Sequence, residues 1–194
     1  NRQARNIVYA IGLGDMTNDA SDTQWNVVES AMALLENPAT TGLPDGIPYG
    51  TVPGNHDHGN AGNTTRLYNT YFGVNHFAGR PWYGGPLGDD NQNHYDLISA
   101  SGLDFVFIYV DFDYNYIDYT QIDKWSAGVL QANAQRRAVV RPRETVVDDV
   151  GEGALEPVVA QHPAAARRAA VLHVVPAARL RVDRAAEEQW PGEQ

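Results

Sequence analysis

The sequence contains no cysteine. Disulfide bonds and thiolate metal sites are therefore excluded, so any metal or acid–base chemistry must use oxygen and imidazole groups. Basic residues are also scarce, because 14 lysines and arginines stand against 24 acidic residues, for a formal net charge of −10. Such an acidic chain is not expected to bind nucleic acid or an anionic membrane through phosphate groups.

Long apolar runs and internal repeats are absent as well. The longest apolar runs fall far below the length needed to span a bilayer, so we expect no membrane partner. At 194 residues the chain is long enough for one domain with its own core.

Alternating strand and helix patterns in the first quarter of the chain predict a βαβ unit. Residues 7–13 form a near-continuous apolar run, which is typical of a strand buried on both faces, and residues 47–52 form a second apolar run. Between them, Ser21 and Gln24 make a capping-box pattern that predicts the start of a helix. Apolar side chains then recur at helical spacing and indicate core packing: Trp25, Val28, Met32 and Leu35.

The middle of the chain predicts loops followed by a β-hairpin and a second helix. Residues 59–93 are rich in Asn, Gly, Tyr and Trp, with one short helical pattern at 67–72, and either substrate contacts or ordinary loop packing explains them. Residues 94–100 and 103–112 predict two antiparallel strands joined at Ser101-Gly102. A helix is predicted from Thr120 and a further core strand at 138–140.

Polar groups follow both of the first two predicted strands. The second strand runs into Pro53 and Gly54, which end it and turn the backbone sharply. Asn55, His56 and Asp57 are then displayed at the strand's carboxyl end, where open α/β sheets bind ligands. An amide oxygen, a proton donor and a carboxylate in a row indicate more chemistry than a plain turn requires.

Two blocks in this order resemble a known family. Gly14-Asp15-Met16-Thr17-Asn18 and Gly54-Asn55-His56-Asp57 match the G-D-x-x-[DN] and G-N-H-[DE] blocks of the calcineurin-like metallophosphoesterases. The resemblance covers residues 7–140. It implies a layered α/β sandwich with metals at the sheet's carboxyl edge, two divalent ions (Fe, Mn or Zn), and hydrolysis of phosphate mono- or diesters. The alternative is a turn rich in Asn, Asp and His that binds nothing.

The resemblance also implies a role for each matching residue. Asp15 would be the carboxylate that bridges the two ions, and Asn55 would bind the second ion through its side-chain oxygen. His56 would stabilise the phosphoryl oxygens and help to protonate the leaving group, and Asp57 would orient His56. Asn18 would support the Asp15 loop. His58 is interpreted instead as a solvated loop histidine.

Other parts of the family pattern are missing. The upstream D-x-H block has no place before the first strand, so we expect that the N-terminal edge is truncated. No downstream lone histidine or G-H-x-H block is present, so we expect a weak or inactive phosphoesterase fragment. The rival interpretation is a non-catalytic binding or structural remnant of the same fold.

The composition changes abruptly near residue 135. Residues 1–134 hold 15 acidic and 5 basic groups, whereas the rest holds 9 of each and is rich in Ala, Arg, Val, Pro and Glu. GC-rich DNA read out of frame yields this composition, and a frame shifted by one nucleotide after residue 140 permits a histidine where the family has one. We therefore divide the chain into a partial phosphoesterase domain, 1–140, and an out-of-frame or disordered tail, 141–194. A genuine disordered or helical tail is the alternative.

Overall fold

In the computed structural model, which describes residues 5–59, 65–111 and 119–142, the first two strands pair in parallel. These strands, β1 (Ala10–Ile11) and β2 (Tyr49–Gly50), are joined through helix α2 (Asp22–Glu36), which confirms the predicted βαβ unit. Both strands are much shorter than predicted. Ile7 and Val8 are 36% and 47% exposed, so the run from residue 7 was wrongly interpreted as a strand buried on both faces.

A second sheet has four strands in the order β3-β4-β5-β6. Strands β4 (His94–Ala100) and β5 (Leu103–Val110) form the predicted antiparallel hairpin. Its turn residues, Ser101 and Gly102, have φ angles of +53° and +74°, and positive φ at both central residues matches the right-handed twist of a hairpin. Strand β6 (Arg137–Pro142) follows helix α6 (Tyr119–Ala132), which confirms the predicted helix and the predicted strand after it. Strand β6 runs parallel to β5.

The region at 59–93 contains more structure than the sequence predicted. Helix α4 (Arg66–Phe72) confirms the short helical pattern, but helix α5 (Val74–Phe77) and strand β3 (Tyr83–Pro86) were missed. Strand β3 contains two glycines and a proline, so pairing with β4 rather than intrinsic propensity makes it a strand. The remaining short elements are α3 (Pro38–Thr41) and the 3₁₀ turn η1 (Asn55–Asp57).

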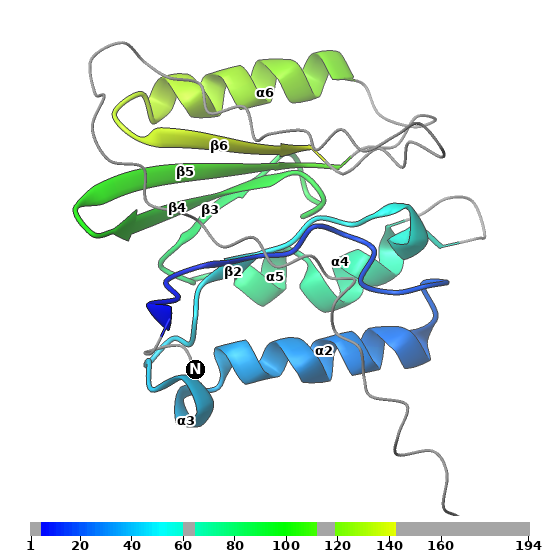
Figure 1. The fold of residues 1–194 in the computed structure, drawn as a ribbon. Coiled ribbons are helices and arrows are strands. Elements are labelled where there is room, and N and C mark those ends of the chain that lie inside the picture. Colours follow the sequence, from blue (N-terminus) through cyan, green and yellow to red (C-terminus); the bar gives the residue numbers. More distant parts are fainter. Residues whose placement is uncertain (1–4, 60–64, 112–118, 143–194) are drawn as a thin grey trace, which may run out of the picture.

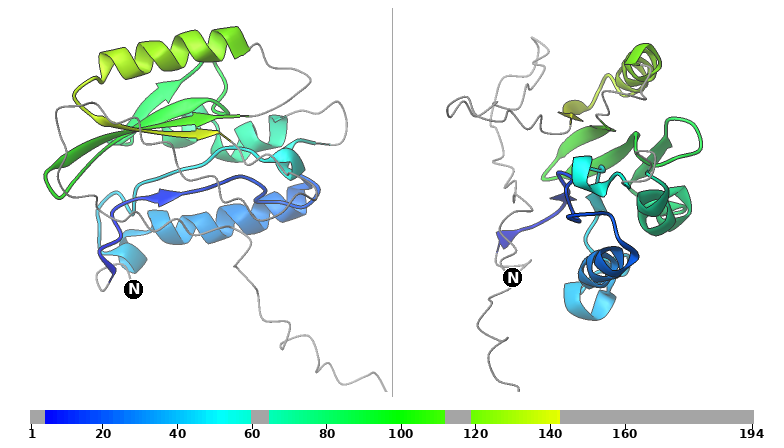
Figure 2. Two further views of the ribbon diagram at one scale, coloured as in Figure 1. Left: turned by 45° about the horizontal axis from the view of Figure 1, so that its top comes forward. Right: turned by 90° about the vertical axis from the view of Figure 1, so that its right-hand side faces the viewer.

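Three apolar clusters hold the layers together. Side chains of β5 alternate between two of them: Phe107 and Tyr109 face a cluster with Tyr9 and Val52, whereas Val106 packs with α6 on the other face. The third cluster lies between α2, β2, α4 and α5, and its buried members are Trp25, Tyr49, Tyr68, Phe72 and Phe77. Helices α6 and α2 consequently lie at opposite ends of the layered molecule, with the strands between them (Figures 1 and 2). The fold is mixed α/β.

The start of α2 is where predicted, but the predicted capping contacts do not form. Ser21 is the N-cap residue, yet its side chain makes no capping hydrogen bond. The side-chain oxygen of Gln24 reaches outward and accepts hydrogen bonds from the backbone N–H groups of Asn18 at 2.7 Å and Asp19 at 3.0 Å. Gln24 therefore fixes the loop that precedes the helix and carries the first motif.

The structure describes only the first two residues of the predicted tail. The predicted tail, 141–194, lies outside the described residues except for the end of β6. Within the described part of the chain, no helix combines the length and apolar character needed to cross a membrane.

Candidate functional site

The loops after β1 and β2 lie against each other at one end of the molecule. Gly14 and Asp15, which follow β1, have φ angles of +87° and +51°. A Cβ atom added at Gly14 would lie 2.8 Å from the backbone nitrogen of Gly54, so only glycine permits this approach. Positive φ is uncommon at non-glycine residues such as Asp15, and the residues that do adopt it are often found at functional sites.

The Asp15 carboxylate contacts the second motif, residues 54–57. Its Oδ1 atom accepts a hydrogen bond from the backbone N–H of His56 at 3.1 Å. A Cβ atom at Gly54 would lie 2.7 Å from Asp15 Cγ, so Gly54 leaves the space that the carboxylate occupies. Because His56 directly follows Asn55, the structure brings together Asp15 and the Asn55 turn, as the sequence predicted. Asp15, Asn55 and His56 are all exposed to solvent.

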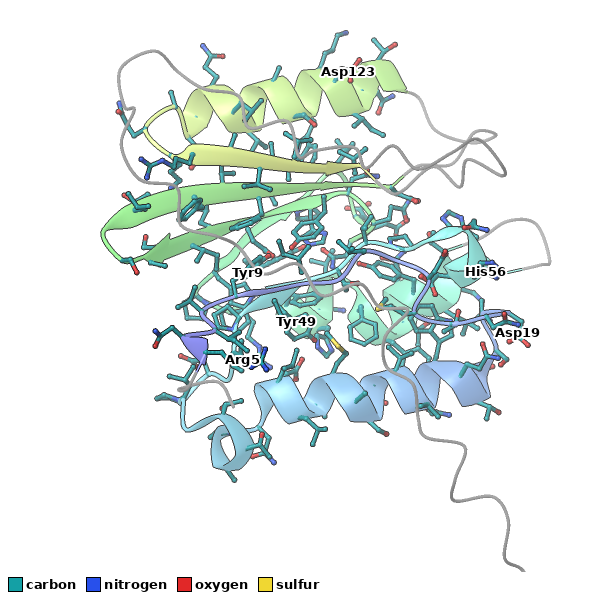
Figure 3. The ribbon with its side chains drawn as sticks, viewed as in Figure 1. Arg5, Tyr9, Asp19, Tyr49, His56 and Asp123 are labelled. Carbon is teal, nitrogen blue, oxygen red and sulfur yellow. The ribbon has the colours of Figure 1, made fainter. Side chains whose placement is uncertain are left out.

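The His56 ring is fixed by the first motif. Its Nδ1 atom lies 2.8 Å from the backbone carbonyl oxygen of Asn18. A carbonyl oxygen can only accept, so Nδ1 donates and Nε2 is left as the nitrogen that can face a ligand. Figure 3 places His56 and Asp19 at the same end of the molecule, away from Tyr9 and Tyr49 in its interior. Asn18 contacts the His56 ring through its backbone carbonyl, whereas the predicted support of the Asp15 loop by Asn18 stays a prediction.

The predicted role of Asp57 was wrong. Its side chain is fully buried and does not hold His56. The carboxylate instead accepts hydrogen bonds from the backbone N–H groups of Gly54 (2.8 Å), Thr17 (2.8 Å) and Met16 (3.1 Å), and from the Thr17 hydroxyl (2.8 Å). Burial raises the pKa of Asp57, while these four donors act to lower it. Asp57 is thus a clasp between the two motif loops.

His58 was also misinterpreted, because it is buried rather than solvated. Its Nε2 atom lies 3.1 Å from Asp111 Oδ1, and the two side chains are 4% and 1% exposed. Asp111 directly follows β5, and its backbone N–H donates to Asn93 Oδ1 at 2.9 Å. The sequence did contain a signal for Asp111, because an acidic residue directly follows an apolar strand. The sequence did not indicate that His58 is its partner.

His76 and His94, the other described histidines, contact residues outside this turn. His76 Nε2 lies 2.6 Å from Glu36 Oε1 and 3.0 Å from the Tyr49 hydroxyl. His94 is buried, stacks on Tyr109 with ring centroids 4.5 Å apart, and contacts the Asn91 carbonyl oxygen through Nδ1 at 2.9 Å. Burial lowers the pKa of His94 to about 4, so this ring is neutral at physiological pH.

The metal-binding capacity of the described residues is small. Across residues 5–59, 65–111 and 119–142, no three His, Cys, Asp or Glu side chains are grouped so that they could hold a metal ion. Asp15 and Asn55 offer two oxygen donors at the surface. Since ligand number determines affinity, this pair alone makes a weak metal site.

Comparison with known proteins adds one relative. No family model matches the chain. The chain is 30% identical over 169 residues to an uncharacterized protein of Bacillus subtilis (strain 168), YvnB, and the match covers 84% of this chain. It covers 12% of YvnB, so this chain corresponds to a small part of that protein's length.

Proposed function

We propose that residues 7–140 carry part of the active site of a metal-dependent phosphate-ester hydrolase of the calcineurin-like metallophosphoesterase type. The observation that supports this proposal best is the hydrogen bond between Asp15 Oδ1 and the His56 backbone N–H. It joins the two sequence blocks that resemble the family. A further support is the parallel pairing of β1 and β2, which delivers both blocks to one edge, as a layered α/β sandwich of this family would.

The proposed chemistry of His56 follows from its fixed ring. With Nδ1 donating to the Asn18 carbonyl, Nε2 is the atom that faces a ligand, and in the imidazolium form it would carry the second proton and donate it to a leaving-group oxygen or to a phosphoryl oxygen. The buried Asp57 clasp would keep His56 next to Asp15 and Asn18 by holding the two loops together. The substrate would be a phosphate mono- or diester.

The described residues do not fit a complete pair of divalent ions. In this type of enzyme the ions supply a hydroxide nucleophile and neutralise the phosphoryl charge. Asp15 and Asn55 could contribute ligands to such a centre, but two oxygens cannot hold two ions. We therefore propose that the 194-residue chain has weak or no hydrolase activity.

The second candidate function belongs to another class. A non-catalytic binding or structural remnant of the same fold would keep the buried clasp and the aromatic core but lack a metal centre. The absence of a three-ligand group among the described residues favours this candidate.

Metal content and hydrolysis of an aryl phosphate ester separate the two candidates. We expect substoichiometric Mn²⁺ or Zn²⁺ on the purified chain, weak hydrolysis of p-nitrophenyl phosphate that a chelator abolishes, and a further loss in Asp15→Asn. The variant His76→Ala is the matched control, since it removes a histidine outside the proposed site. Hydrolysis that survives chelation would exclude the metal-dependent mechanism, whereas complete absence of metal binding and turnover would favour the remnant.

A further inference from the structure

The turn that carries His56 is held from two sides by two different carboxylates. On the β1 side, Asp57 binds the backbone of Met16 and Thr17. On the β5 side, His58 is bound by Asp111. The catalytic candidate His56 directly precedes the two attached residues in the sequence, and it is exposed while Asp57 and His58 are both buried.

The second attachment is part of a packed junction between the two sheets. The Tyr68 hydroxyl donates to the Thr51 carbonyl oxygen at 2.7 Å and so ties α4 to the end of β2. Burial raises the pKa of Tyr68, and the negative charges of Asp111 and Asp57 raise it further. Helix α4 is thus bonded to the residue that follows β2, and His58 bonds the same loop to the residue that follows β5.

A hydrogen bond between two buried side chains is a weak source of net stability. Folding exchanges the bonds that both groups made to water for the bond between them, so the net gain is small. What a buried pair does provide is a fixed mutual position, because its hydrogen-bond geometry tolerates little displacement. Because His58 lies two residues after His56, a fixed position of this pair also constrains the backbone that carries His56.

We infer that the His58–Asp111 pair is a positioning element of the candidate site, which anchors the 55–58 turn to β5 and thereby sets the direction in which His56 presents Nε2. The chemical meaning of this inference rests on the proposed function. Whether the His58–Asp111 pair fixes the direction of the His56 ring depends only on contacts within this chain.

The test is the tautomer of the His56 ring, measured through its nitrogen chemical shifts by NMR on the full-length chain at about pH 8.5, where an ordinary histidine is neutral. The native chain should show the Nδ1–H tautomer, because Nδ1 donates to the Asn18 carbonyl. In His58→Ala and in Asp111→Ala the His56 shifts should move toward those of a free ring, which favours Nε2–H. The double variant should add little, since both changes remove one shared interaction.

Two further variants make the result decisive. His76→Ala, which removes the partner of Glu36, should leave the His56 tautomer unchanged. Asp111→Asn keeps an oxygen acceptor of the same shape, so it should fold if the alanine variants do not, and it should give a smaller shift in the same direction. An unchanged His56 tautomer in a folded His58→Ala or Asp111→Asn variant would overturn the inference. This measurement needs neither metal nor substrate, so failure of the hydrolase proposal would appear separately, as absent turnover with the tautomer effect intact.

Discussion

The carboxylate of Asp57 accepts a hydrogen bond from the backbone N–H of Thr17 at 2.8 Å, so the second motif of the chain holds the first. The two residues are 40 positions apart in the sequence. This contact closes the βαβ unit at the end where Asp15 and His56 meet, and it explains why an acidic residue follows His56 without touching its ring.

Loss of the Asp57 clasp should destabilise the fold. Asp57→Ala removes an acceptor from three backbone N–H groups and one hydroxyl, and buried donors left without a partner cost about 1–3 kcal/mol each, partly relieved by water entry. We expect the free energy of unfolding in urea to fall by roughly 3 kcal/mol. Asp45→Ala, at an exposed position, is the control and should change it by less than about 0.5 kcal/mol. Equal effects of the two substitutions would contradict the clasp.

Two glycine substitutions should have opposite effects. A methyl group at Gly54 would enter the space of the Asp15 carboxylate and its backbone, so Gly54→Ala should cost about 1–3 kcal/mol as overpacking does. Gly128 lies within α6 and an added Cβ there meets no atom within 4 Å. Gly128→Ala should therefore stabilise the chain by about 0.5–1 kcal/mol through helix propensity. Urea denaturation midpoints would report both changes, and a neutral Gly54→Ala would contradict the tight approach of the two loops.

Asp96 should make stability decrease as the pH rises. Its carboxyl group is buried beside the hydroxyl of Tyr9, and burial raises its pKa to about 8. Because the folded pKa is raised, the folded chain keeps this proton while the unfolded chain releases it. The contribution is therefore fully present below about pH 4, where the unfolded group is still protonated, and is lost progressively up to about pH 8.

The variant Asp96→Asn isolates this contribution, since an amide does not titrate. The difference in unfolding free energy between native chain and variant should shift in favour of the variant by several kcal/mol between about pH 4 and about pH 8. The buried His94 acts in the opposite direction between about pH 4 and 6.5, and its Nε2 atom lies 3.9 Å from Asp96 Oδ2, so the comparison is repeated in a His94→Gln background, which removes this coupled contribution. A pH-independent difference would mean that Asp96 is ionised in the folded chain.

Gln24, rather than Ser21, should matter for the loop before α2. Gln24→Ala removes the acceptor of the Asn18 and Asp19 N–H groups, and we expect a cost of about 1 kcal/mol in thermal or urea unfolding. Ser21→Ala should cost less than about 0.5 kcal/mol, because the serine side chain makes no capping hydrogen bond. The reverse order of the two effects would restore the capping box that the sequence pattern indicated.

The sequence by itself determined the elements whose signals are local. The hairpin of β4 and β5 and the helices α2, α4 and α6 were predicted because hydrophobic period, turn residues and end signals lie within a few residues of one another. The same applies to the two motifs: glycine next to a polar residue after an apolar run located Asp15, Asn55 and His56 at one edge before any contact was known. Strand β3 was missed because its glycines and proline carry turn signals, and only its partner β4 makes it extended.

Only the tertiary structure decided which polar side chain does what. Asp57 and His58 directly follow the exposed His56 in the sequence, yet their side chains turn into the interior toward Thr17 and Asp111, which are 40 and 53 positions away. The length of β1 was likewise determined by how much of the apolar run β2 pairs with. The physical reason is that a side chain's partner depends on which backbones the packed layers bring within hydrogen-bond distance. The local pattern of residues does not contain that information.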